Sequence, residues 1–320
     1  MEHYDAADLP ALEQISVQVA SGGTPLREDA GIMFAQQLNY VRTANYERRT
    51  PAMRIFDIVP ISTEVPEYAE TIEQKSYDIV GVAKVISNYA HDLPRADVVA
   101  SSRLVKVKDI GDSFGYSVRE LQASNATGAQ LDVRKGAAAR KAIDVKTAQI
   151  AAIGEPVYGL FGLLNHPSIG TTVGLTGGWA TATGDVMLSD LNKFVATIAG
   201  QSKNNFQTTR VAMADTDLNL MGSKYLANSG GKTVAQAFRE QHPEITLVGL
   251  VEFRGAGTAG GNLMVASEFS PENYAFDLVQ PFNQQPAQAR NLEVVINCLA
   301  RVGGVNVFYP EALTKGTLAL

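Results

Sequence analysis

Two glycine-rich motifs are the parts of the sequence that most resemble a phosphate-binding site. The first, GAGTAG from Gly255 to Gly260, has the spacing of a dinucleotide-binding loop, whose glycines let the backbone approach a pyrophosphate at the start of a helix. The residues after it, NLMVASEF, are typical of a strand, so the sequence favours a hairpin tip over a cofactor loop. The second, NSGGKT at 228–233, lacks the first glycine of a phosphate-binding loop, because Leu226 takes that position.

Candidate metal ligands and nucleophiles are scattered along the sequence and form no recognisable site. Asp215 and Asp217 in ADTD could hold a divalent cation, although an aspartate-capped turn is the commoner use of such a pattern. Cys298 lies in an apolar run and is predicted to be a small core residue. The histidines form no ligand pair on a predicted helix, and they are His3, His91, His166 and His242. We therefore expect no catalytic residue, no metal site and no cofactor, and a protein that is not an enzyme.

The composition describes a large globular protein. Of 320 residues, 45% are hydrophobic and 19% charged, which is enough to bury a core in two or more lobes. A net charge of -6 argues against binding of nucleic acid over the whole surface but permits a local basic face. One cysteine fits a reducing compartment. The start MEHYDAADLP lacks a signal-peptide pattern, and no apolar run would cross a bilayer, so we expect a soluble protein made in the cytoplasm.

A reversal of charge marks residues 64–108, after a predicted arm and a strand-like run, MRIFDIVPI, at 53–61. The acidic limb holds Glu64, Glu67, Glu70, Glu73 and Asp78. The basic limb, with two strand-like runs, holds Lys84, Arg95, Arg103, Lys106 and Lys108. The two limbs could pair with each other as a hairpin, or each could bind the opposite limb of another copy. A solvated hairpin with ordinary surface charge explains the same pattern.

The sequence predicts a long helix over 129–153, because this stretch is rich in alanine, lacks proline and ends at Gly154. One apolar seam runs through Leu131, Ala138, Val145 and Ala152, and a second through Ala139, Ile143 and Ile150. Two seams indicate contacts on two sides of the helix. The basic residues between them are Arg134, Lys135, Arg140, Lys141 and Lys146, a cluster that usually is a solvated face.

The rest of the chain alternates short elements. An apolar, glycine-rich segment, GEPVYGLFGLLNHPSI at 154–169, follows the long helix. Helices are predicted at 185–202 and 232–243, and strands at 114–121, 210–214, 245–253 and 262–269. Residues 290–310 are predicted to form two strands joined by a glycine bend.

This order of parts resembles the major capsid protein of tailed bacteriophages, the Hong Kong 97 type fold. The likeness is carried by GYSVREL, the helix pattern G..LD..KG.AARKA, the segment GEPVYGLFGLLNHPSI and the late RVGGVNVFYPEAL. It implies an α+β fold with an N-terminal arm (1–52) and an extended β-hairpin loop with a flanking strand (53–111). A peripheral domain with the spine helix would follow (112–155 and 270–303), and then an axial α/β domain (156–269 and 304–320). The segment 154–169 would be the turn into the axial domain, where Leu160, Phe161, Leu163 and Leu164 pack between lobes.

The function that the resemblance implies is structural. Copies of the chain would form hexamers and pentamers of an icosahedral head around double-stranded DNA, in a virion made in the bacterial host cytoplasm. The family also allows separate scaffolding, portal and decoration proteins as partners, weak non-specific contact with the packaged DNA, and no membrane. An encapsulin-like protein nanocompartment is the alternative, and a nucleotide-dependent enzyme using the Gly255–Gly260 loop is the second. The inter-subunit candidates are Glu64, Glu67, Glu70, Glu73, Lys84, Arg103, Lys106 and Lys108, and the inner-surface candidates are the five basic residues of the long helix.

Overall fold

The computed structural model describes residues 53–81, 83, 95–120, 122, 131–171, 175–176, 178–227 and 229–318. The chain divides into two units, Met1–Pro51 and Ala52–Leu320, and every described residue belongs to the second. The predicted arm, His3, His91 and Lys84 lie outside the described residues.

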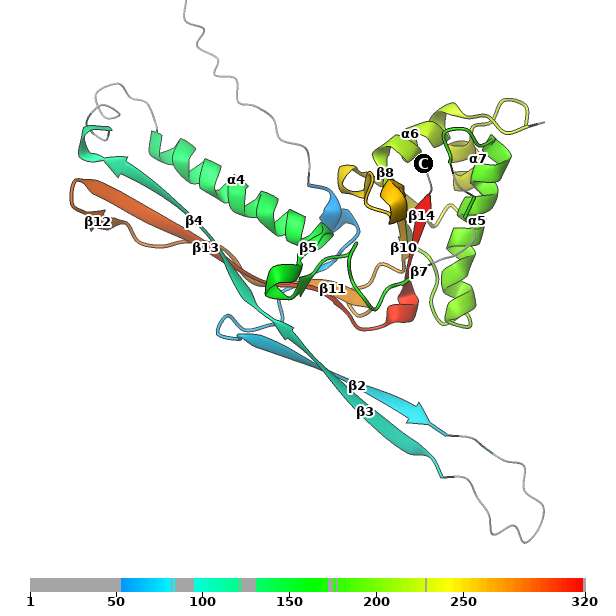
Figure 1. Cartoon of the computed structure of the whole chain (residues 1–320), viewed down its shortest axis with the longest axis horizontal. Helices are drawn as coiled ribbons and strands as arrows, with labels where there is room; N and C mark the ends of the chain where they lie inside the picture. The colour runs from blue at the N-terminus through cyan, green and yellow to red at the C-terminus, as the bar shows by residue number, and fades with distance from the viewer. Residues whose placement is uncertain are drawn as a thin grey trace, which may run out of the picture. The chain divides into compact units, whose positions relative to one another are not determined.

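The first sheet has five strands and is covered by a long helix. Its strands are β1 (Ile61–Ser62), β4 (Lys108–Ser117), β11 (Tyr274–Gln284), β12 (Gln288–Arg290) and β13 (Glu293–Val307). The strand β13 pairs antiparallel with β4, β11 and β12, and β1 adds to β11 in parallel. Helix α4 (Leu131–Ala152) runs beside β4 and β13 (Figure 1) and packs Ile143 against Cys298 and Ala300. The predicted long helix is thus confirmed, and Cys298 is a buried core residue.

Only one of the two seams predicted on α4 is buried along its length. Ala139, Ile143 and Ile150 are buried, whereas Ala138 is exposed and Val145 retains 42% of its accessible surface. Between Ala138 and Val145 the other seam makes none of the predicted contact within the subunit, because the sheet covers a single side of the helix. At the last turn Ala152 is also buried, because the end of the helix enters the core that both sheets share.

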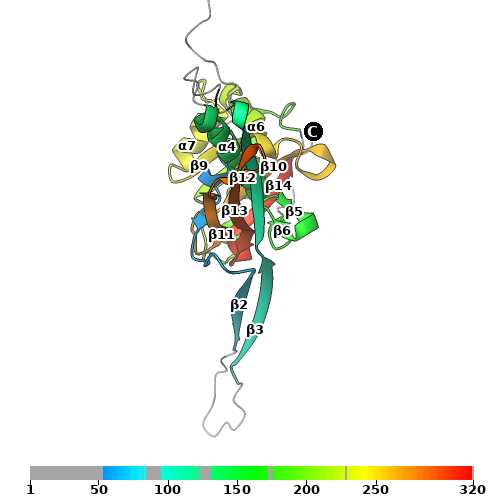
Figure 2. The same ribbon diagram turned by 90° about the vertical axis from the view of Figure 1, so that its left-hand side faces the viewer.

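A two-stranded ribbon leaves the first sheet and confirms the predicted hairpin. It consists of β2 (Thr71–Val80) and β3 (Asp97–Lys106), paired antiparallel with Thr71 opposite Lys106. Only Val107 separates β3 from β4, so one extended backbone runs from the ribbon into the sheet (Figure 2). The acidic limb is only partly in this ribbon, because Glu64, Glu67 and Glu70 lie in the segment before β2.

The predicted strand over 53–61 is wrong. Residues Ile55–Asp57 form a 3-10 turn, η1, and only β1 is extended. The apolar residues of this run, Ile55 and Ile58, are fully buried in the shared core, and the Tyr274 hydroxyl donates to the Ile58 carbonyl oxygen at 2.6 Å. A turn brings these side chains to the core, which an exposed edge strand would not do.

The second sheet has the order β7 (Gly170–Thr171), β14 (Leu313–Leu318), β10 (Asn262–Ser267), β8 (Arg210–Ala214) and β9 (Thr246–Leu250). Helices α5 (Gly184–Gln201), α6 (Asp215–Ser223) and α7 (Val234–Gln241) accompany it. The strand predicted at 210–214 and the helices predicted at 185–202 and 232–243 are confirmed with small shifts of their ends. The strand predicted at 245–253 ends at Leu250 and continues as η3 (Val251–Phe253). None of the helices described is long and apolar enough to span a membrane.

The segment after α4 carries the chain from one sheet to the other. Its two short strands, β5 (Gly154–Glu155) and β6 (Leu160–Phe161), pair across the 3-10 turn η2 (Pro156–Tyr158). Leu160 and Leu163 are buried in the shared core and Leu164 packs at its margin, as predicted. Phe161 packs edge-on against His166 instead, with ring centroids 5.7 Å apart.

Residues 290–310 form one strand and not the predicted pair. The glycines Gly303 and Gly304 lie inside β13, where the pairing with β11 shifts register after Asp277. Gly304 has φ +76°, and a Cβ atom there would lie 2.8 Å from the Phe161 carbonyl oxygen. The bend is therefore a bulge that makes room for β6, and the remaining chain reaches β14 through η5 (Pro310–Ala312).

Candidate assembly surfaces

The segment that carries the acidic residues is fixed by its backbone. Arg301 of β13 donates hydrogen bonds to the carbonyl oxygens of Glu67 and Ala69, the latter at 3.2 Å, and pairs with Asp109 at 2.6 Å. The Val107 amide donates to the Glu70 carbonyl oxygen at 2.9 Å. The side chains of Glu64, Glu67 and Glu70 remain exposed. Glu73 on β2 is exposed as well, so the structure places all four acidic inter-subunit candidates on the surface.

A second set of contacts fixes the start of the ribbon through β3. The Arg103 guanidinium donates to the Ser168 hydroxyl at 3.1 Å and lies 5.4 Å from the centre of the Phe161 ring. Gln74 of β2 donates to the Val307 carbonyl oxygen at 3.4 Å. We call this region, where Ile72, Gln74 and Arg103 meet the first sheet and β6, the hairpin root. Arg103 therefore interacts within its own subunit, whereas Lys106 and Lys108 are exposed at the junction with β4.

One face of the ribbon carries exposed apolar side chains that the charge pattern did not reveal. The register places Tyr77 opposite Ala100 and Glu73 opposite Leu104, so these four side chains share a face. Tyr77 and Leu104 retain 65% and 69% of their accessible surface.

The basic residues of α4 fall into two groups. Three of them form ion pairs: Lys135 with Glu120 at 3.1 Å, Arg140 with Asp144 at 3.8 Å and Lys146 with Glu155 at 2.7 Å. The hydrogen bond from Lys135, helped by the Ser117 amide, lowers the pKa of Glu120. Arg134 and Lys141 are seven residues apart on the side of α4 that faces away from the sheet. Only these two basic side chains share the open side of the helix.

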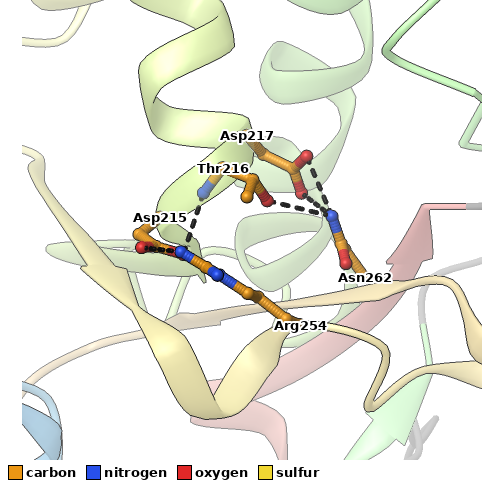
Figure 3. A network of polar contacts seen from close by, with 5 residues as sticks. All are labelled: Asp215, Thr216, Asp217, Arg254 and Asn262. Atoms are coloured by element: carbon orange, nitrogen blue, oxygen red, sulfur yellow. Dashed lines mark hydrogen bonds and ion pairs between the residues drawn. The ribbon is translucent and has the colours of Figure 1, made fainter.

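The two aspartates of ADTD are held by protein donors at the start of α6 (Figure 3). Arg254 pairs with Asp215 and lowers its pKa, mainly through the hydrogen bond between them. Asn262 donates to both carboxylate oxygens of Asp217 at 3.0 Å, while burial raises the pKa of that carboxyl. Within the described part of the chain, no three histidine, cysteine, aspartate or glutamate side chains gather as a metal site would require. The network instead ties α6 to Arg254, between β9 and β10, and to the first residue of β10, Asn262.

The sequence predicted that the GAGTAG motif is the tip of a hairpin, and this prediction is wrong. The motif connects β9 to β10, which lie on opposite sides of β8, so it is a crossover. Its amides are used inside the segment: Gly255 donates to the Asn262 side chain at 3.0 Å and Gly257 to the Gly261 carbonyl oxygen at 2.8 Å. The motif contains the short 3-10 turn η4 (Thr258–Gly260) and leads into β10, so no α-helix begins there to bind a phosphate.

The NSGGKT motif connects α6 to α7. Its last residue, Thr233, is the N-cap of α7 and forms a capping box with Gln236. It follows a helix, whereas a phosphate-binding loop follows a buried strand. Neither glycine motif has the geometry that a nucleotide would need.

Comparison with known proteins gives a consistent result. The sequence matches the family described as major capsid protein over residues 81–317, and no curated protein matches it. The structure is similar to the capsid of Myoviridae phage XM1, with a TM-score of 0.77 and 19% identity over 93% of this chain and 100% of the other. It is also similar to the capsid of an empty GTA particle (TM-score 0.65, 12% identity, 93% and 99% covered) and to Mycobacterium phage Bobi (0.61, 13%, 92% and 99%). At these identities the structural similarities establish the fold.

Proposed function

The chain belongs to the major capsid protein family, and from this premise we propose that its copies form the hexamers and pentamers of an icosahedral phage head that encloses double-stranded DNA. The protein is a structural capsid subunit, and the family match favours this function over a nanocompartment shell or a nucleotide-dependent enzyme. The observation that carries the finer proposal is the ribbon of β2 and β3. An isolated two-stranded ribbon is marginal in water, so a ribbon exposed on both faces is best explained by a neighbouring copy that covers it.

The ribbon supports a contact with an apolar centre and a charged rim. Tyr77 and Leu104 would supply most of the affinity, because exposed aromatic and aliphatic side chains gain most from burial. The exposed carboxylates at 64–73 and the basic residues Lys106 and Lys108 would set the register by charge complementarity. Lys84 would belong to the same surface but lies outside the described residues.

We extend the proposal to the division of the chain into parts. Residues 53–111 would be the extended loop with its flanking strand, and 112–155 with 270–303 the peripheral domain around α4. Residues 156–269 and 304–320 would be the axial domain around the second sheet. This division is supported by the separate hydrophobic core that α5, α7 and the second sheet form. The proposed boundary at residue 303 falls in the bulge of β13.

Reversal of three acidic residues tests the proposed assembly. Changing Glu67, Glu70 and Glu73 together to lysine should abolish regular shells while leaving the monomer folded, because these side chains are exposed. The readouts are circular dichroism for folding, and size-exclusion chromatography with negative-stain electron microscopy for assembly. The matched control replaces the same residues with glutamine, which removes the charge without reversing it and should reduce the yield of shells less. Normal shells from the lysine variant would refute charge-guided assembly.

A second proposal concerns the packaged DNA. Arg134 and Lys141 would face it, since Lys135, Arg140 and Lys146 are engaged by carboxylates of their own subunit. Contact through two cations is weak, independent of sequence and sensitive to salt. The remaining partners that we propose, from the family alone, are separate scaffolding, portal and decoration proteins. The subunit would be made in the host cytoplasm before it enters the virion capsid.

Charge reversal on α4 separates this contact from the general charge of the subunit. A plot of log affinity for duplex DNA against log salt concentration has a negative slope. In the double variant Arg134→Glu and Lys141→Glu this slope should be less steep by about 2, as expected for two lost phosphate contacts. Fluorescence anisotropy with a labelled duplex measures the slope. The control, Lys203→Glu with Arg239→Glu, makes the same change of charge beside the second sheet, after α5 and in α7. It should make the slope less steep by less than 1. Equal slopes for the two double variants would exclude the assigned surface.

A further inference from the structure

A buried carboxyl group lies beneath the hairpin root. Asp277 of β11 retains only 3% of its accessible surface, and it accepts a hydrogen bond from a neutral donor, the side-chain amide of Asn306 on β13. A carboxylate in such a place is costly unless a cation neutralises it. The groups that keep water away from Asp277 therefore decide how costly its ionisation is.

Asp277 is enclosed on its two sides by strand pairing and above by the ribbon. In the sheet it is paired with Ser62 of β1 and with Gly304 of β13. Above the sheet, Ile72 of β2 reaches over Gly303: a Cβ atom on this glycine would lie 3.0 Å from the Ile72 Cδ1 atom and 3.6 Å from the Asp277 Oδ2 atom. Ile72 therefore covers the carboxyl group from the hairpin root.

The charges around Asp277 do not offset its ionisation. Burial, together with the smaller effect of the Glu64 carboxylate, raises its pKa to about 6 against the hydrogen bond from Asn306. Arg301 of β13 points to the carbonyl oxygens before β2 and to Asp109. The groups that β2 presents at the root, Ile72 and Gln74, are neutral, and so is Phe161 of β6, which contacts Gly304.

We propose that the hairpin root is a proton-sensitive hinge, in which protonated Asp277 lets Ile72 pack onto β13 and ionised Asp277 loosens the root. The cover at Ile72 is the part that yields, because β1 and β13 are joined to β11 by backbone pairing, whereas the root is held by the packing of Ile72 and by single side-chain hydrogen bonds from Gln74 and Arg103. Lifting Ile72 admits water to the carboxylate. The proposal concerns the single chain and does not depend on the proposed assembly.

The sign of the effect follows from proton binding. A carboxyl group whose pKa is higher in the closed root than in the open root binds more protons when the root is closed. Acid therefore favours closure, and closure weakens as the pH rises through about 6. Glu64 acts in the same direction, since its charge opposes a second charge nearby.

Hydrogen exchange measured by mass spectrometry tests the hinge in the full chain. The variant Asp277→Asn keeps the shape but cannot ionise, so at pH 8 its amides at 71–75 and 103–107 should exchange at least ~10-fold more slowly than those of the wild type. At pH 5 the difference should be smaller, because the effect of ionisation is lost progressively between about 6 and the pKa of an exposed aspartate, about 3.9. Comparison at one pH removes the chemical dependence of exchange on pH, and size-exclusion chromatography ensures equal assembly states.

Two further measurements keep the test decisive. The control Asp217→Asn changes another buried carboxyl group, next to Asn262 in the second lobe, and should leave the root unchanged. In the wild type, exchange at the root relative to β8 and β10 should rise ~10-fold from pH 5 to pH 8, which needs no variant. A constant ratio would overturn the proposal, and so would an equal slowing of exchange in Asp277→Asn at pH 5 and pH 8, which would indicate a packing effect.

Discussion

Replacing Gly304 by alanine is expected to lower the free energy of unfolding by about 3 kcal/mol. The residue has φ +76°, where a side chain costs about 1 kcal/mol. The new Cβ atom would also lie 2.8 Å from the Phe161 carbonyl oxygen and 3.3 Å from the Phe161 amide nitrogen, so two backbones must separate inside the core. Overpacking of this kind costs a further ~1–3 kcal/mol.

Urea unfolding followed by circular dichroism measures this effect. The matched control is Gly200→Ala, because Gly200 lies in α5 with no atom within 4 Å of its added Cβ and has no positive φ. Alanine should stabilise that helix by up to about 1 kcal/mol. Unfolding midpoints that are equal for Gly304→Ala and the wild type would show that the bulge does not need glycine.

Replacing Arg301 by methionine is expected to free the segment before β2 at a cost of about 3 kcal/mol. Methionine keeps much of the apolar packing but removes both hydrogen bonds to the carbonyl oxygens of Glu67 and Ala69 and the ion pair with Asp109. Hydrogen bonds from a charged donor contribute ~1.5–3 kcal/mol each, and part of this is regained when water replaces the arginine.

A glutamate-specific protease measures the release directly, since Glu64, Glu67 and Glu70 lie in this segment. Cleavage there should be at least ~10-fold faster in Arg301→Met than in the wild type. Asp109→Asn removes the ion pair alone and should change the rate by less than ~3-fold, since the pair is partly exposed. The exposed Arg140→Met should have no effect, and unchanged cleavage in Arg301→Met would show that the segment is held by other contacts.

Local pattern was sufficient to predict the elements whose own residues determine them. The alanine-rich stretch of α4, the apolar run of β8 and the helix α5 appear where expected, because periodicity and end signals are contained in each segment. The ribbon was also predictable, since its two strands are near in sequence. The family resemblance then supplied the order of the parts.

The errors lie where distant segments decide the local structure. Ile55 and Ile58 look like strand residues, but the core and the Tyr274 hydroxyl hold them in a turn. The crossover at GAGTAG depends on β8 lying between β9 and β10, which no local pattern records. Arg301 and Asp277 act through partners more than twenty residues away, so neither was named among the candidates. The assembly candidates themselves rest on charge alone.

The continuous backbone from β3 through Val107 into β4 has a mechanical consequence. A pull along the ribbon acts along the axis of β4, which is bound to β13 by ten residue pairs from Lys108 to Ser117. Because antiparallel hydrogen bonds lie across the strands, such a force shears all of these pairs together and cannot open them one at a time. The sheet can therefore resist tension in the direction of the ribbon far better than peeling at its edge.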